Sequence, residues 1–162
     1  KLGGVAAAEL AAFLKTELPE MIDCLDPNVA ARVKAADDMP AWDYVRRRTI
    51  LDSLYQSAAA RMADVDAVLT PTVAITPPTL ASLQPEGAYP KANMHALRNT
   101  VIANFLGLCA LTLPVGKDAV GMPVGLQVLA GPWQDAKLLA IGQAIENELG
   151  TGLEILGQPP VV

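Results

Sequence analysis

Basic residues, histidine, cysteine and long hydrophobic runs are all scarce in this sequence of 162 residues. Its 12 Lys and Arg face 17 Asp and Glu, which leaves a net charge of −5. This balance supplies no cationic surface for nucleic acid or anionic lipid, so we expect neither as a partner. No apolar run reaches the roughly 20 residues that a membrane helix needs, so we also expect no membrane span.

Cysteine is limited to Cys24 and Cys109, too few for the disulfide framework of a small secreted domain. The sequence has no basic segment followed by an apolar one, which is the pattern of a secretory signal. We therefore expect a cytoplasmic protein with two free thiols. Because the sequence begins with Lys1 and not with Met, we also expect it to be part of a longer polypeptide.

Hydrophobic residues make up 52% of the chain and charged residues 18%, a composition typical of a folded domain and unlike a disordered segment. We expect a single domain piece over residues 1–162. Within it we predict a helical lead-in at 1–65, strands with a proline-rich loop, a helix and a hairpin at 66–131, a final helix at 132–150 and a tail at 151–162.

Three helices are predicted in the lead-in by apolar residues at steps of three and four. The first spans Ala6–Leu18, the second Asp26–Ala36, and the third is a long helix from Pro40 to Val65. The second helix starts with a capping carboxylate and a proline. Four arginines decorate the long helix, and we favour a solvated face over a binding patch for them: Arg46, Arg47, Arg48 and Arg61.

The pattern changes after the long helix. Prolines exclude regular structure over most of residues 71–90, a loop length that usually serves a site or links units. The remaining elements predicted are a strand at Ala67–Leu69, a helix at Asn93–Leu106 ended by Gly107, a hairpin of strands Cys109–Val115 and Val124–Ala130, a helix at Gln134–Leu149, and an irregular tail. Helices alternating with buried strands indicate an α/β or α+β fold, and three strands are too few for a full sheet.

No catalytic group stands out from the residues alone. Serine occurs only three times, and none of the three lies in a Gly-x-Ser-x-Gly turn: Ser53, Ser57 and Ser82. Cys109 could pair with His95, the sole imidazole, but a cysteine that opens an apolar strand is more typical of a core residue. For His95 a surface position is the favoured interpretation, with a substrate contact as the alternative.

Metal and cofactor sites are not predicted. One histidine and two distant cysteines cannot supply a metal ligand set, and no glycine-rich phosphate loop is present. Asp64 and Asp66 lie close together but lead into a strand, so we expect them to solvate a turn. We therefore name no catalytic residue, no metal and no cofactor.

Residues 66–146 resemble the C-terminal part of an amidase-signature enzyme. The resemblance is carried by Asp66-Ala67-Val68-Leu69-Thr70-Pro71-Thr72, by Asn104-Phe105-Leu106-Gly107, by Leu113-Pro114-Val115-Gly116, by the run from Gly121 to Gly131, and by Leu138-Leu139 with Glu146. The block from Asn104 to Gly131 is its most specific part. Residues 26–61 also fit the family's usual lead-in, with Tyr44 near the start of the long helix.

The resemblance implies an α/β fold in which helices pack on a mixed β-sheet that is incomplete in this chain. It implies hydrolysis of a small-molecule amide by a Ser–cis-Ser–Lys triad, in which one serine attacks the carbonyl while the second serine and the lysine relay its proton. In the family these residues come from a Gly/Ser-rich segment of the N-terminal half. This sequence has no such segment, so the resemblance carries over no catalytic residue.

What the resemblance leaves to this chain is scaffold and part of the substrate pocket. We expect His95, Asn99 and Asn104 to contact substrate or position loops, with a small-molecule amide and the missing N-terminal half of the same enzyme as partners; a homo-oligomer stays open. Amidotransferase A subunits carry an acid where Leu97 stands, which favours a stand-alone amide hydrolase over transamidation.

Two other interpretations stay open: a non-catalytic assembly or regulatory module with an amidase-like fold, and an unrelated α/β domain. If the chain is instead a segment of an amidase-family enzyme, one physical consequence follows. The sheet should have an unpaired edge and an apolar face where the absent half packs, and both favour aggregation of the isolated chain.

Overall fold

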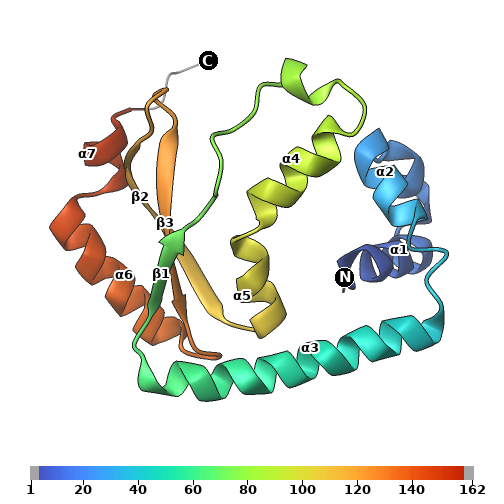
Figure 1. Cartoon of the computed structure of the whole chain (residues 1–162), viewed down its shortest axis with the longest axis horizontal. Coiled ribbons are helices and arrows are strands. Elements are labelled where there is room, and N and C mark those ends of the chain that lie inside the picture. Colours follow the sequence, from blue (N-terminus) through green and yellow to red (C-terminus); the bar gives the residue numbers. More distant parts are fainter. Residues whose placement is uncertain (1–3, 159–162) are drawn as a thin grey trace. The chain divides into compact units, whose positions relative to one another are not determined.

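A computed structural model describes residues 4–158 (Figure 1). The chain has two compact units, the first ending at Leu54 and the second starting at Tyr55. The first unit is helical and the second contains the sheet. No helix in the described range is long and apolar enough to cross a membrane.

The first unit is built from three α-helices and a short 3₁₀ segment: α1 (Ala6–Glu17), η1 (Pro19–Cys24), α2 (Pro27–Lys34) and the first part of α3 (Ala41–Arg61). As predicted, Asp26 caps α2, because its carboxylate accepts a 2.9 Å hydrogen bond from the amide of Asn28. Ala11, Leu14 and Val33 form the buried core between α1 and α2.

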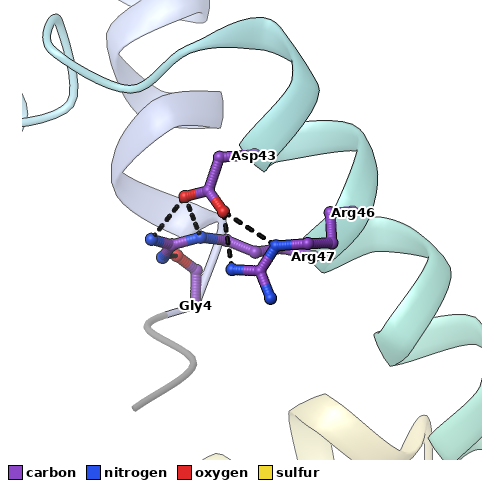
Figure 2. A network of polar contacts seen from close by, with 4 residues as sticks. All are labelled: Gly4, Asp43, Arg46 and Arg47. Carbon is purple, nitrogen blue, oxygen red and sulfur yellow. Dashed lines mark hydrogen bonds and ion pairs between the residues drawn. The ribbon is translucent and has the colours of Figure 1, made fainter.

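The arginine run at the start of α3 is only partly a solvated face. Arg46 and Arg47 both donate to the carboxylate of Asp43, with N–O distances between 2.7 and 3.1 Å (Figure 2). Arg47 also donates to the carbonyl oxygen of Gly4, which connects α3 to the segment that precedes α1. The hydrogen bonds from Arg46 and then Arg47 lower the pKa of Asp43, which is 9% exposed. The contacts to Asp43 thus lie within α3, and the bond from Arg47 to Gly4 is the one of these contacts that reaches outside this helix.

The second unit contains a three-stranded sheet in the order β1-β3-β2, formed by β1 (Val68–Pro71), β2 (Cys109–Lys117) and β3 (Pro123–Ala130). The β2–β3 pairing confirms the predicted hairpin, and both pairings are antiparallel. A bulge between Pro114 and Gly116 shifts the register near the hairpin end. The mixed sheet expected from the resemblance also requires parallel strand pairs, and these stay a prediction.

The two faces of the sheet differ in chemistry because side chains alternate along each strand. One face is apolar: Val128 and Ala130 are fully buried with Leu138 of α6 (Asp135–Leu149), which packs against β2 and β3. The register places Thr70, Gln127 and Thr112 in one row on the opposite face. Of this polar row, Thr112 also lines the groove described below, whereas Thr70 and Gln127 do not.

Three sequence predictions need correction. The helix expected at 93–106 is two helices, α4 (Ala88–Leu97) and α5 (Thr100–Leu106), although Gly107 ends the second in the left-handed conformation as predicted. The long helix ends at Arg61 and continues as the 3₁₀ segment η2 (Met62–Asp64).

The third correction concerns the tail. It is not wholly irregular, because α7 (Gly152–Leu156) starts with a capping box between Thr151 and Glu154. Residues 159–162 of the predicted tail lie outside the described residues. The proline-rich segment contains the 3₁₀ segment η3 (Ala81–Leu83) and is otherwise mostly irregular up to α4.

Candidate functional site

A groove of about 490 Å³ lies where the loop 72–77 leaves β1 and faces the hairpin of β2 and β3. Its wall is mainly apolar, with a few polar side chains among the twelve residues that form it. The polar members are Thr72, Thr76, Thr112 and Asp118. A largely apolar hollow with a few convergent polar groups is typical of a small-molecule site.

Two threonines meet over a glycine in this groove. The hydroxyl oxygens of Thr72 and Thr112 lie 3.2 Å apart, within hydrogen-bond distance, although 40 residues separate them. A Cβ at Gly125 would lie 2.8 Å from both Thr112 Cγ2 and Thr72 Oγ1, closer than packed atoms tolerate. The absence of a side chain at position 125 therefore allows the two hydroxyls to approach across β3.

Asp118 fastens the loop to the hairpin. Its Oδ2 accepts a 2.7 Å hydrogen bond from the hydroxyl of Thr76, and its Oδ1 accepts from the amides of Val120 and Met122 at 3.0 and 2.9 Å. The bond from Thr76, followed by the backbone bond from Met122, lowers the pKa of Asp118 below its ordinary value. The carboxylate is thus ionised at neutral pH and holds the rim of the groove in place.

Asn99, one of the expected site residues, lies at the break between α4 and α5. Its side-chain amide donates a 2.7 Å hydrogen bond to the carbonyl oxygen of Pro71, the last residue of β1. The amide of Gln127, which is 2% exposed, reaches Thr70 Oγ1 at 3.3 Å and the carbonyl oxygen of Asn99 at 3.5 Å. These contacts fix the end of β1, from which the groove loop starts.

The structure does not bring the three expected site residues together. Asn104, on α5, lines a second groove of about 540 Å³ next to Tyr55, Cys109 and Trp133. His95 is exposed on α4 and lines neither groove. Cys109 packs against the apolar cluster under the sheet, which agrees with the core interpretation of this cysteine.

Catalytic and metal chemistry have no evident site in the described residues. No group of three or more His, Cys, Asp or Glu side chains there could hold a metal ion. Asp66 forms an ion pair with Lys137 at 2.9 Å. The hydrogen bond from Lys137 lowers the pKa of Asp66. The groove itself has hydroxyl groups but neither a lysine nor a histidine among its lining residues to activate one as a nucleophile. Its arrangement suits binding.

Sequence reasoning missed the polar groups of the groove. Thr72 and Thr112 belong to segments that the resemblance covers, and Asp118 lies in the predicted hairpin loop. Their proximity depends on β1 pairing with β3, which no local pattern indicates. The available signal was Gly125, since a glycine inside a strand often marks a close approach.

Comparison with known proteins gives a consistent result. The family model described as Amidase matches residues 15–139. The 2-amino-5-chloromuconic acid deaminase of Comamonas testosteroni is 46% identical over 157 residues, which cover 97% of this chain and 34% of the deaminase. The fatty acid amide hydrolase of Oryza sativa subsp. indica is 36% identical over 107 residues, which cover 65% of this chain and 18% of that protein.

A solved structure supports the same relationship. A crystal structure of an amidase superposes with a TM-score of 0.73 at 28% identity, over 89% of this chain and 33% of the amidase. The chain thus spans about a third of the length of the deaminase and of this amidase.

Proposed function

This chain belongs to the amidase family, and from that premise we propose that it is part of an enzyme that hydrolyses a carbon–nitrogen bond in a small-molecule amide. The match to the family model over residues 15–139 is the observation that carries the proposal. The chemistry of the groove supports it, because hydroxyl groups in an apolar wall suit an uncharged polar ligand.

In this proposal the chain binds and positions, and the cleaving groups come from elsewhere in the enzyme. The Ser–cis-Ser–Lys triad that the resemblance implies has no counterpart in the sequence. The groove supports this division of roles, since its threonines have no lysine or histidine beside them. The substrate would lie with its amide group in the groove, and the triad of the remaining part of the enzyme would reach the carbonyl carbon there.

The three expected pocket residues keep different roles in the proposal. Asn99 positions the groove loop through Pro71. Asn104 contacts substrate only if the second groove belongs to the same site, and His95 contacts it only if a further part of the enzyme closes over α4. We place Thr72 and Thr112 before all three as candidate substrate contacts.

The remainder of the same enzyme is the proposed partner, packing on the sheet. β1 pairs with β3 alone among the described strands, so its outer edge is open. Beside this edge lies an apolar hollow of about 520 Å³ lined by residues of β1, β3 and α6, among them Leu69, Leu126, Ile141 and Ile145. Because the chain spans about a third of the length of the deaminase, we propose a segment of the same protein as the occupant. A homo-oligomer and a cytoplasmic location also belong to this proposal, the latter because Cys24 and Cys109 are free.

The names of the relatives suggest the product. A deaminase and amide hydrolases share the release of an amino group or amine from carbon. We therefore propose ammonia release from a small primary amide or a related amino compound as the reaction of the whole enzyme.

The test is to assay ammonia release by the full-length protein and by the 162-residue chain alone, with a panel of small primary amides. The full-length protein should release ammonia, and replacement of its triad serine by alanine should abolish the activity. The chain alone should be inactive. A full-length protein that is inert toward the whole panel would favour the non-catalytic module, and an active isolated chain would contradict the proposed division of roles.

A further inference from the structure

We propose that the hydroxyl pair of Thr72 and Thr112 is a specificity element that binds the amide group of the substrate and discriminates against the matching carboxylate. This inference rests on the proposed function and assigns a recognition step to the groove. It is carried by the geometry of the pair and by the charge of the groove.

The hydrogen-bonding capacity of the pair matches an amide. Each threonine hydroxyl has one proton to donate and two lone pairs. With the two oxygens 3.2 Å apart, one proton is shared between them, whichever threonine donates it. The other proton stays available for a carbonyl oxygen, and lone pairs stay available for an N–H group. A primary amide offers both an oxygen acceptor and N–H donors, whereas a carboxylate offers acceptors only.

The charge of the groove works in the same direction. Among its twelve lining residues, Asp118 is the one that carries a charge, and none is a lysine or an arginine. Three hydrogen-bond donors hold Asp118 ionised, so its negative charge persists at neutral pH. A carboxylate in this groove would meet like charge and no cation, whereas an amide meets no such penalty. The acid formed by hydrolysis would therefore leave more readily than the amide.

Gly125 makes this arrangement available. Any Cβ at this position would displace one of the two threonine side chains, because it would lie 2.8 Å from atoms of each. The backbone amide of Thr72 also donates a 2.8 Å hydrogen bond to the carbonyl oxygen of Gly125, which fixes the loop side of the pair. The pair is thus held in position by the backbone on one side and by β2 on the other.

The experiment uses full-length enzyme with Thr72→Val and Thr112→Val, which keep the side-chain shape and remove the hydroxyl. Thr49→Val serves as the matched control, because the Thr49 hydroxyl donates to the carbonyl oxygen of Val45 within α3 and does not line the groove. Binding of benzamide and butyramide, and of benzoate and butyrate, is measured by NMR titration, and ammonia release gives KM and kcat.

We expect each groove variant to weaken amide binding about threefold to tenfold, as for the loss of one neutral hydrogen bond. KM should rise correspondingly while kcat changes less, and carboxylate binding should stay weak throughout. Thr112→Ser, which keeps the hydroxyl, should restore amide binding, whereas a purely packing role would not predict this rescue.

The two proposals fail separately. A parent protein that binds neither amide, or groove variants that bind amides as the parent does, overturns the hydroxyl pair as a recognition element. Tighter binding of benzoate than of benzamide does the same. A parent that binds amides through the pair but releases no ammonia supports this inference and contradicts the proposed function.

Discussion

The side-chain amide of Asn99 donates a 2.7 Å hydrogen bond to the carbonyl oxygen of Pro71, 28 residues earlier in the chain. This bond joins the break between α4 and α5 to the end of β1. Because the groove loop starts at the next residue, the bond sets where that loop leaves the sheet. A helix interruption thus has a defined role in shaping the groove.

Asn99→Asp should destabilise the second unit more than Asn99→Ala does. The aspartate would place a second acceptor against the carbonyl oxygen of Pro71, which is unfavourable as long as the carboxyl is ionised, whereas alanine only removes the bond. We expect a loss of about 1 kcal/mol for alanine and about 2 kcal/mol for aspartate at neutral pH. Urea denaturation measures both. Equal stability of the two variants would show that the bond to Pro71 is not what holds Asn99.

This contact also explains one error of the sequence analysis. Residues 93–106 have a continuous helical pattern, with no proline or glycine at the position where the helix breaks. The interruption coincides with a contact to β1 that lies far away in the sequence. Local signals succeeded where the cause is local, as with the cap of Asp26 and the left-handed stop at Gly107. The capping box of α7 was readable as Thr151-x-x-Glu154 and could have been predicted.

Gly125→Ala should destabilise the sheet by about 1 to 3 kcal/mol, because the added methyl group overlaps Thr72 and Thr112. Gly131→Ala is the matched control: its Cβ would meet its nearest neighbour, Gln134, at 3.4 Å, an ordinary contact. Urea denaturation of both variants makes the comparison. A Gly125→Ala protein as stable as the control would mean that the hairpin yields at no cost.

Thr76→Val should raise the pKa of Asp118 toward its ordinary value of 3.8, because the hydrogen bond from Thr76 is the largest cause of the lowered pKa. Since the folded pKa lies below the unfolded one, Asp118 contributes stability that is fully present above about pH 4 and is lost as the pH falls through the lowered folded value. NMR titration of the carboxyl carbon tests this. Thr16→Val, whose hydroxyl bonds within α1, should leave the titration unchanged.

Asp43→Asn should loosen the first turn of α3, because an NH2 group, which cannot accept a hydrogen bond, replaces one of the two carboxylate oxygens that Arg46 and Arg47 share, and the negative charge is lost. Faster amide hydrogen exchange at the start of α3 and in the first turn of α1 is the expected result, since Arg47 also binds Gly4 (Figure 2). Asp52→Asn is the control, because its contact to Arg48 is exposed and 3.8 Å long. Unchanged exchange in the Asp43 variant would contradict the anchoring role.

The groove could be predicted only in outline. The length of the loop at 71–90 is typical of a segment that serves a site or links units, and the resemblance implies a substrate pocket. Which side chains line the groove depends on the pairing of β1 with β3, which joins residues 55 to 61 positions apart. The polar row that holds Thr70 and Gln127 is equally hidden, because each residue alone is unremarkable in a strand.

Because the side chain of Gly125 is a single hydrogen atom between Thr72 and Thr112, we expect these three positions to evolve together. Homologues that replace this glycine should carry a smaller residue at the position of Thr72 or Thr112, and homologues that keep both threonines should keep the glycine. Whether a substitution is tolerated at one of these three positions then depends on the residues at the other two. Substitutions at positions 72, 112 and 125 should therefore covary.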